Sequence, residues 1–474
     1  MPKDKFQIDM CHGPLFSKIV LFALPLMLTN ILQLLFHAAD LIVIGHYSNY
    51  EAMAAVGCTS SMNSFYINVF IGISVGSNVL AAKYFGAKDP ENIRKTVHTS
   101  MMFALVGGII LSIVALLTAK PLLVLMGTPE KLLPKSCMYI WICFGSIPFI
   151  MLYNFGCSIL RAVGDTRRPF IFLIIAGVIN VILNLVLVIA CKLDVEGVAI
   201  ATAASHIIAA SLIVRTLLKS ESDIKLRLRE LRIDFKTLKD MLFIGVPAGI
   251  QSSCFAISNM TIQSSINTFG EVAMAGTTAA LGLEGIAYVG SNAFHFTAIS
   301  FVAQNLGGQH YKRIQRSIFY CFFCAIVIST IMGWSFLWFG DTLLKLYSPD
   351  LAVIKWGLLR MKILFTTYFI CGLMDVSSGA LRGLGYSMLS TILCLSGACF
   401  FRIFWVTCIF PLDPTMETLL ISYPVSWLLV AVFAGVALVI IYRRLLRTNC
   451  PRLVYWSKLG PGVPRGFRYT GNLK

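Results

Sequence analysis

Residues 25–47 read PLMLTNILQLLFHAADLIVIGHY and form most of an apolar run over 15–44. About 20 mostly apolar residues cross a bilayer as a helix, so this run is long enough to span a membrane. It nevertheless carries Asn30, Gln33, His37 and Asp40, spaced three, four and three residues apart. Those spacings place the four polar side chains on one helix face. We expect that face to contact protein or water, because polar groups are costly in lipid.

The rest of the chain is equally apolar. Hydrophobic residues make up 57% of the 474 residues and charged residues only 13%, whereas soluble chains carry about 25% charged residues. Eleven further apolar runs cover 53–82, 97–117, 136–160, 170–190, 197–218, 241–269, 276–303, 318–339, 353–379, 389–410 and 419–442. Helices satisfy their own backbone in lipid. The sequence therefore predicts an all-α polytopic membrane protein with twelve transmembrane helices.

The basic charge has a topological explanation. The chain carries 39 Lys and Arg against 22 Asp and Glu, a net charge of +17. Most of these basic residues lie in alternate connections, such as 83–95, 161–168, 312–316 and Arg382, and in the tail. The positive-inside rule then predicts that both termini are cytoplasmic. We expect a bacterial inner-membrane protein whose basic residues contact anionic lipids and bind no nucleic acid.

The two halves of the chain repeat each other at an offset of 221 residues. AKYFGA at 82–87 matches AQNLGG at 303–308, and ILRAVG at 159–164 matches ALRGLG at 380–385. This predicts two parallel six-helix repeats around a central cavity, an architecture typical of transporters. The predicted parts are a lobe over 1–218, a connection over 219–240, a lobe over 241–442 and a basic tail over 443–474. Mixed charges and spaced Leu and Ile residues favour a surface helix over 219–240.

The first lobe holds a candidate ion site. Asn180 and Asn184 lie four residues apart, and Thr202 lies in the next run, so all three side chains could meet Asp40. A carboxylate, two carboxamides and a hydroxyl are hard oxygen ligands that suit H⁺ or Na⁺. We expect Na⁺, if it is the ion, at Asp40, Asn180 and Asn184. Hydrogen bonding between helices is the structural alternative.

The second lobe holds candidate substrate contacts. The candidates in this lobe are Gln251, Asn259, Gln263, Glu284 and Asp375. Gln33 and His37 of the first run are candidate substrate contacts as well. The acids could bind a cation or pair with Arg402 or Lys362. Pro25 and Pro247 occupy corresponding runs, where each removes a helical hydrogen bond and could act as a hinge.

In this order, several motifs resemble the multidrug and toxic compound extrusion (MATE) family. The motifs are residues 25–47 quoted above, FGAKD at 85–89, LRAVGDTRRP at 160–169, INVILN at 179–184, GVAIATAAS at 197–205, VAQNLGG at 302–308 and ALRGLGYS at 380–387. The resemblance implies efflux of amphiphilic, often cationic compounds, driven by inward H⁺ or Na⁺. It implies that Asp40, Asn180, Asn184 and Thr202 form the first-lobe site, although many relatives carry Asp where this chain has Asn184.

We therefore expect a monomeric antiporter that exports small amphiphilic cations, uses no cofactor and is not an enzyme. A flippase for lipids or lipid-linked sugars is the nearest alternative, and it would favour several cavity Arg or Lys residues for an anionic headgroup. An integral-membrane enzyme is a more distant alternative, because the scattered His37, His206 and His295 do not form a catalytic or metal-ligand pattern.

Overall fold

The computed structural model describes residues 6–47 and 50–447, apart from the side chain of His37 and several side chains within 41–65. All regular elements in these ranges are helical. The first lobe contains α1 (Leu15–Tyr47), α2 (Tyr50–Gly86), α3 (Pro90–Leu125), α4 (Leu133–Gly145), α5 (Ile147–Ala162), α6 (Arg167–Leu185) with the π-helical η1 (Val186–Ala190), and α7 (Val195–Lys219). The connection holds one short turn, η2 (Leu228–Glu230).

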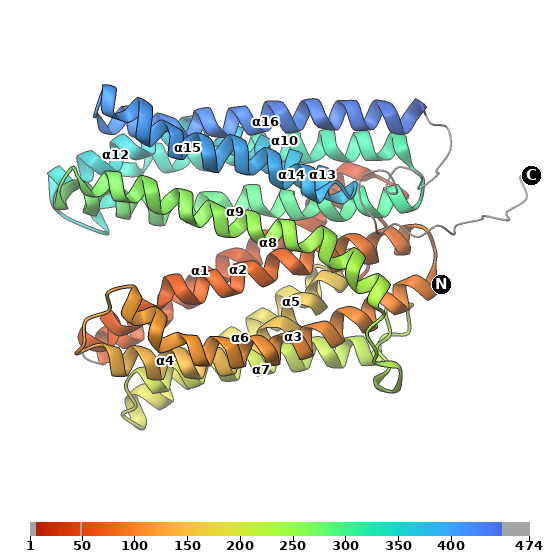
Figure 1. Cartoon of the computed structure of the whole chain (residues 1–474), viewed down its shortest axis with the longest axis horizontal. Helices are drawn as coiled ribbons and strands as arrows, with labels where there is room; N and C mark the ends of the chain where they lie inside the picture. The colour runs from red at the N-terminus through yellow and green to blue at the C-terminus, as the bar shows by residue number, and fades with distance from the viewer. Residues whose placement is uncertain (1–5, 48–49, 448–474) are drawn as a thin grey trace, which may run out of the picture.

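The second lobe repeats this order. It contains α8 (Phe235–Asn267), α9 (Glu271–Gly307), α10 (Tyr311–Trp338), α11 (Gly340–Lys345), α12 (Leu351–Thr366), α13 (Tyr368–Gly383), a span built of α14 (Ser387–Cys394), η3 (Leu395–Phe400), α15 (Phe401–Phe404), η4 (Trp405–Ile409) and η5 (Phe410–Leu412), and α16 (Met416–Arg447). Figure 1 shows the two lobes side by side, with their helices running roughly along the long axis.

Twelve spans are present in the described residues when two bent helix pairs are each counted as one span. The bends, of 45° and 49°, fall at Ser146 between α4 and α5 and at Thr367 between α12 and α13. The sequence predicted an unbroken helix at each place. The Ser146 hydroxyl donates to the Cys143 carbonyl at 2.7 Å, and the Thr367 hydroxyl donates to the Ile363 carbonyl at 3.0 Å. Each hydroxyl thus bonds a carbonyl of the turn before the bend, and the Cys143 carbonyl also accepts the Ser146 amide at 3.0 Å.

The 221-residue repeat is visible in the backbone. The bends at Ser146 and Thr367 are separated by that offset, and so are two pairs of residues with positive φ. Lys88 and Gln309 have φ values of 55° and 59°, and Gly164 and Gly385 have 93° and 90°. Positive φ is uncommon outside glycine, so the Lys88 and Gln309 pair is a specific match. These features confirm two repeated six-helix units.

The prediction of a surface helix over 219–240 is wrong. This segment is largely irregular, with only η2 inside it, and α8 already begins at Phe235. Two backbone amides of this segment donate hydrogen bonds to side chains of α3. The Arg227 amide donates to His98 Nε2 at 3.1 Å, and the Asp234 amide donates to Thr99 Oγ1 at 3.1 Å. Ile224 is buried in the first lobe. These tertiary contacts replace the hydrogen bonds of a helix.

Pro25 and Pro247 lie inside α1 and α8, which continue through both residues. The two breaks in the described spans lie elsewhere, at Ser146 and Thr367. The hinge role of the prolines stays a prediction.

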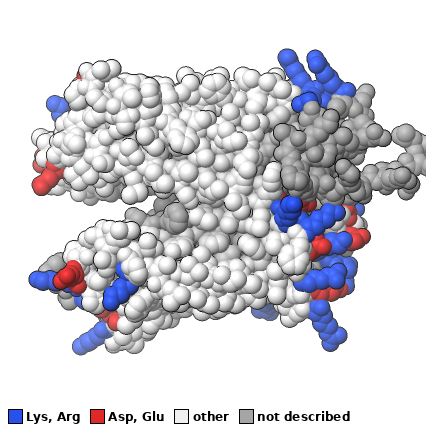
Figure 2. Space-filling view, viewed as in Figure 1, with Lys and Arg blue, Asp and Glu red and all other residues white. Residues whose placement is uncertain are grey.

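Charged residues lie mainly at the two ends of the molecule, and a wide apolar band separates these ends. Figure 2 shows Lys and Arg gathered mostly at one end, with mainly uncharged surface along the helices. We call this the basic end; α1 and α10 begin there and α16 ends there. The same view shows a hollow between the lobes that opens at the opposite end. The lobes are therefore apart at the far end and joined toward the basic end.

Close backbone contacts join the lobes. A Cβ added at Gly76 of α2 would overlap the Met241 carbonyl oxygen of α8, and one at Gly245 of α8 would overlap the Ile73 carbonyl oxygen of α2. Helices that approach this closely require small residues at the contact. The sealed half of the molecule therefore depends on glycine at both positions.

An N-terminal strap, residues 6–14, crosses the basic end. The Ile8 amide donates to the Gly164 carbonyl of the first lobe at 3.2 Å. The Met10 amide donates to Gln304 Oε1 at 3.2 Å, and Asn305 Nδ2 of the second lobe donates to the Met10 carbonyl at 3.2 Å. The strap is thus bonded to both lobes.

Candidate functional site

The four predicted first-lobe residues form one hydrogen-bonded chain. Asn184 Nδ2 donates to Asp40 Oδ1 at 2.5 Å and to Asn180 Oδ1 at 3.2 Å. Asn180 Nδ2 in turn lies 3.5 Å from Thr202 Oγ1. The two asparagines are buried, whereas Asp40 and Thr202 are half-buried. Three spans, α1, α6 and α7, therefore bring these side chains together.

Within this hydrogen-bonded chain, one side-chain oxygen accepts no hydrogen bond. Asn184 Oδ1 is buried and has no hydrogen-bond partner. An unpaired buried carbonyl is unfavourable, and it marks a position where a cation or a donor would be stabilised. Rotating the carboxamide by half a turn would direct this oxygen at Asp40. It could then accept a hydrogen bond from a protonated Asp40, or share a cation with an ionised one.

The other residues of the predicted polar face of α1 lie in different environments. Asn30 Nδ2 donates to Asn292 Oδ1 of α9 at 3.1 Å and so links the two lobes. The Gln33 side chain is exposed. The side chain of His37 lies outside the described residues.

Glu284 of α9 is neutralised by a base. Its Oε2 accepts from Arg360 Nη2 of α12 at 2.8 Å, and both side chains are largely buried. The sequence named Arg402 and Lys362 as partners for the acids, but Arg360 holds this position. A paired carboxylate attracts a cationic substrate less strongly than a free one, so this contact weakens the assignment of Glu284 to substrate binding.

Arg402 belongs to an adjoining polar group. Its guanidinium lies 4.3 Å from the ring centroid of Tyr423, and that of Arg360 lies 5.5 Å from the same ring. Arg402 Nη1 donates to Asn259 Oδ1 at 3.1 Å. Asn259 itself is exposed. Of the predicted contacts on α8, Asn259 thus links the exposed surface of this helix to a buried arginine, whereas Gln263 Nε2 donates along its own helix to Asn267 Oδ1 at 3.1 Å.

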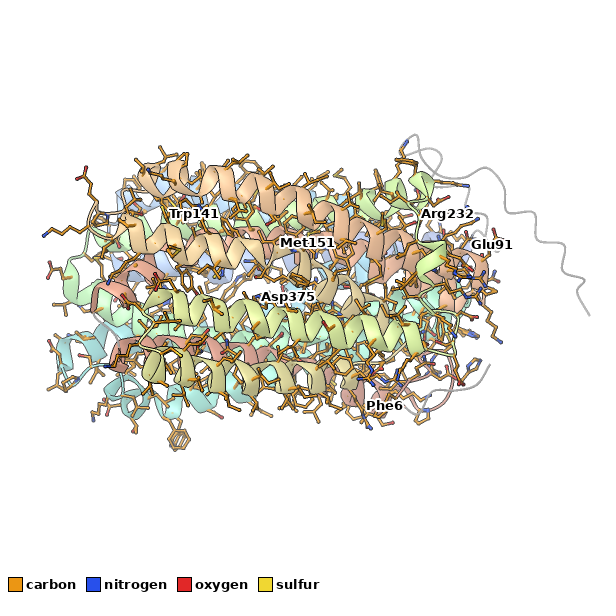
Figure 3. The ribbon with its side chains drawn as sticks, turned by 90° about the horizontal axis from the view of Figure 1, so that it is seen from below. Phe6, Glu91, Trp141, Met151, Arg232 and Asp375 are labelled. Atoms are coloured by element: carbon orange, nitrogen blue, oxygen red, sulfur yellow. The ribbon has the colours of Figure 1, made fainter. Side chains whose placement is uncertain are left out.

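Asp375 lies near the middle of the molecule (Figure 3), inside a buried network. Its Oδ2 accepts from the Ser291 hydroxyl at 2.8 Å, and its backbone carbonyl lies 2.8 Å from His295 Nδ1. His295 Nε2 lies 3.3 Å from Arg382 Nη1, and Arg382 Nη2 donates to Gln251 Oε1 at 2.8 Å. Gln251 and Asp375 thus belong to one network.

The prediction for Arg382 is wrong. Its place after an apolar run indicates a basic residue of a loop, yet Arg382 is only 6% exposed and belongs to the Asp375 network. The first lobe has Arg161 at the same position of the repeated motif, and its guanidinium also bonds inside the lobe, with Nη2 donating to the Ser158 hydroxyl at 2.9 Å.

A two-lobed bundle of membrane-spanning helices, with polar groups inside each lobe and a hollow between the lobes, is the architecture of an integral-membrane transporter. The MatE family model matches residues 25–186 and 247–406, one segment in each lobe. The chain belongs to the MatE family. It is a membrane transporter of the class that contains multidrug efflux proteins, as the sequence predicted.

Curated relatives agree with this placement. The probable multidrug resistance protein YoeA of Bacillus subtilis is 29% identical over 79% of this chain and 82% of its own length. The probable multidrug resistance protein NorM of Thermotoga maritima is 24% identical over 78% and 81%. A protein of Shewanella oneidensis named FAD transporter is 25% identical over 81% and 86%. The names of these relatives describe multidrug resistance or transport, and they favour neither the flippase nor the enzyme alternative.

Solved structures share the fold. A MOP superfamily transporter from Pyrococcus furiosus superposes with a TM-score of 0.88 at 20% identity, covering 94% of this chain and 99% of that one. A multidrug resistance MATE family transporter in an outward-facing conformation gives 0.86 at 20% identity, covering 94% and 100%.

Proposed function

We propose that this protein is a secondary antiporter that exports small amphiphilic compounds while H⁺ or Na⁺ enters at Asp40. The supporting observation is the hydrogen-bonded chain Asp40–Asn184–Asn180–Thr202, in which the buried Asn184 Oδ1 has no partner. Within the described residues Asp40 has no ion-pair partner. A cation or proton would therefore be the favourable counter-charge for this carboxylate.

Coupling requires an ion with unequal affinity for two states of the transporter. α1 carries Asp40 and also contacts the second lobe through Asn30 and Asn292. Charge neutralisation at Asp40 would change how α1 packs against α6 and so alter the gap between the lobes. Substrate would enter and leave through the hollow shown in Figure 2.

The proposal includes an orientation. Lys and Arg gather at one end, and by the positive-inside rule that end would be cytoplasmic. In the bacterial inner membrane the hollow would then face outward. A monomer is sufficient for this scheme, because each chain contains both lobes.

Organic cations are the first substrate class to test, with anions as a second candidate. Arg360, Arg382 and Arg402 are all buried in the second lobe, which holds only Glu284 and Asp375 as spanning acids near them. Three buried arginines near two acids leave a net positive charge in this lobe. That charge, together with the relative named FAD transporter, favours an anionic amphiphile as the alternative substrate.

The test uses the purified full chain in vesicles with an imposed pH or Na⁺ gradient. Uptake of a fluorescent organic cation and of FAD is measured for the wild type, Asp40→Asn and Asp341→Asn. Asp341 is an exposed acid that pairs with Lys345 four residues away, so its substitution is the matched control. We expect one gradient to accelerate transport, Asp40→Asn to abolish that acceleration, and Asp341→Asn to retain it.

Transport that responds to neither gradient would remove the antiporter proposal. Normal gradient-driven transport by Asp40→Asn would remove Asp40 from coupling. Faster uptake of FAD than of the cation would replace the cation assignment with the anionic one.

A further inference from the structure

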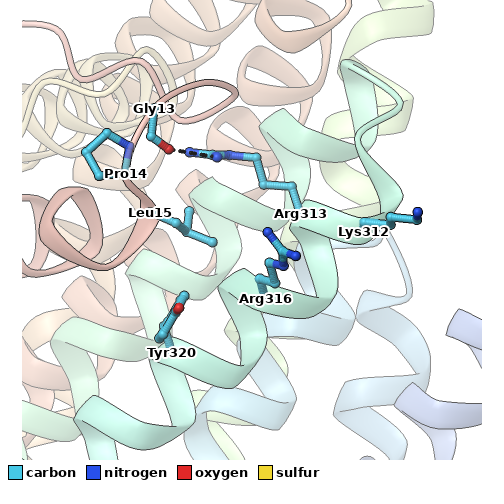
Figure 4. A pocket seen from close by; sticks show the side chains of 7 residues that line it. All are labelled: Gly13, Pro14, Leu15, Lys312, Arg313, Arg316 and Tyr320. Atoms are coloured by element: carbon cyan, nitrogen blue, oxygen red, sulfur yellow. Dashed lines mark hydrogen bonds between the residues drawn. The ribbon is translucent and has the colours of Figure 1, made fainter.

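A surface pocket of about 360 Å³ lies at the basic end, away from the hollow and from both polar sites (Figure 4). It is formed where α1 and α10 begin, so one wall comes from each lobe. Its lining residues are Gly13, Pro14, Leu15, Lys312, Arg313, Arg316 and Tyr320. At this end of a spanning helix the surrounding medium is the headgroup layer of the membrane.

Arg313 forms the fixed wall of the pocket. Its three nitrogens donate to the carbonyls of Met10 at 2.8 Å, Gly13 at 2.9 Å and His12 at 3.1 Å. These acceptors are neutral, so they orient the guanidinium without cancelling its charge. Asp9, the acid of the same strap, is engaged with His12, whose Nδ1 lies 3.1 Å from its Oδ2.

Two further positive charges border the pocket. Arg316 and Lys312 are exposed, and neither forms an ion pair within the part of the chain that the structure describes. In Figure 4 the Arg316 guanidinium lies near that of Arg313, facing the start of α1, while the Lys312 side chain extends outward from the rim. The first turn of α1 contains no acidic residue. The lining thus supplies three cations and no carboxylate, with Lys312 at its outer rim.

The side of the pocket nearer the membrane interior is aromatic and apolar. Phe16 packs edge-on against Tyr320, with ring centroids 5.6 Å apart, and lies 6.4 Å from Phe323. Phe16, Phe319 and Phe323 are 45%, 64% and 50% exposed. An anion that binds here would therefore have an apolar surface beside it, along which a hydrocarbon chain can pack.

We propose that this pocket binds the phosphate headgroup of an anionic phospholipid. Arg316 and Lys312 would contact the phosphate, Arg313 would add its charge from the pocket wall, and the acyl chains would lie along Phe16, Phe319 and Phe323. Guanidinium groups match phosphate geometry well, and a basic pocket between helices at the membrane surface suits a lipid headgroup. The aromatic flank favours a lipid over free phosphate.

The test is native mass spectrometry of the purified full chain with added phosphatidylglycerol or phosphatidylcholine. The variant carries Lys312→Ala and Arg316→Ala. The control carries Lys236→Ala and Lys239→Ala, which removes two exposed charges from the start of α8 at the same end. We expect the wild type and the control to retain phosphatidylglycerol in preference to phosphatidylcholine, and the pocket variant to bind it at least about tenfold more weakly.

Two further arms complete the test. Lys312→Arg with Arg316→Lys keeps both charges and should retain most of the binding, which a purely structural effect of the alanines would not predict. Inorganic phosphate in large excess should not displace the lipid. Equal lipid retention by the pocket variant and the wild type would overturn the site, and displacement by phosphate would overturn its assignment to a lipid.

Discussion

At the scale of the residue, Asp40 shows how far side-chain spacing can predict a site. Its position on α1 and the four-residue spacing of Asn180 and Asn184 placed three oxygen ligands at matching faces, and Thr202 followed from the next span. The structure joins all four in one chain. What spacing could not provide was the direction of each amide, because that depends on which donors and acceptors the neighbouring helices present.

The acids of the second lobe show the opposite case. Glu284 and Asp375 are conspicuous in sequence, but their partners come from helices whose rotation the sequence leaves open. Arg360 reaches Glu284 from α12, and Ser291 reaches Asp375 from α9. A buried acid and its base can be far apart in sequence, so the correct pairing follows only from packing.

Asp234 provides a test of a single capping residue. Its Oδ1 accepts the Thr237 amide at 2.8 Å at the start of α8. This backbone hydrogen bond lowers the pKa of Asp234 from its ordinary value of 3.8, against a smaller opposing effect of burial. A carboxyl with a lowered pKa stabilises the folded state above its ordinary pKa, and that contribution is lost as the pH falls through the folded value. The window therefore lies below about pH 4.

We expect Asp234→Ala to destabilise the protein by about 1 kcal/mol at pH 7 and by less at pH 3, where the wild-type carboxyl is becoming protonated. Thermal unfolding in one detergent at both pH values measures this difference. Asp234→Ser, which keeps an acceptor oxygen, should behave more like the wild type. An equal loss for Asp234→Ala at both pH values would contradict the charged cap.

At the scale of the element, hydropathy predicted the spans well but did not predict their breaks. Residues 136–160 and 353–379 read as uninterrupted apolar runs, yet both are bent, at Ser146 and Thr367. A hydroxyl inside a membrane helix is compatible with either a straight or a bent helix, because it can bond a carbonyl of the preceding turn in both. Packing against the other helices of the lobe decides between the two.

Glycine contacts between α2 and α8 should control whether the lobes can seal. A Cβ at Gly245 would overlap the Ile73 carbonyl, which is backbone and cannot move aside cheaply. We expect Gly245→Val to lower gradient-driven transport at least tenfold and to lower the melting temperature, since overpacking a tight contact costs about 1–3 kcal/mol.

Gly435→Val is the matched control, because a Cβ at Gly435 of α16 has no atom within 4 Å. Vesicle transport and thermal unfolding compare the two variants. Wild-type transport by Gly245→Val would show that the close α2–α8 contact is not needed in the transport cycle.

At the scale of the whole molecule, the N-terminal strap lies across the end where the two lobes are joined, and the burial of its Cys11 shows whether the strap is in place. Cys11 Sγ lies 3.7 Å from the Gln304 carbonyl, and burial raises the pKa of this thiol to about 11 from its ordinary value of 9.0. Its reactive thiolate is therefore roughly a hundredfold scarcer than that of an exposed cysteine. Gln304 Nε2 also donates to the Ala162 carbonyl of the first lobe at 3.1 Å, so this one side chain ties the strap to both lobes.

Gln304→Ala should loosen the strap and speed maleimide labelling of Cys11 at least about tenfold, because both the exposure and the thiolate fraction increase. Labelling is followed by peptide mass spectrometry, with the exposed Cys408 as the internal reference. An unchanged Cys11 rate, with Cys408 also unchanged, would show that the strap stays closed without Gln304.

The sequence by itself determined that this chain is a twelve-span membrane protein with a repeated six-helix unit, since apolar runs and a fixed offset require no tertiary information. It also identified the polar residues inside the spans, because lipid makes each of them exceptional. Only the tertiary structure decided which of them meet, where the helices bend, and that the connection over 219–240 packs on α3 instead of forming a helix. Those outcomes depend on contacts between segments far apart in sequence, which residue spacing along one helix cannot encode.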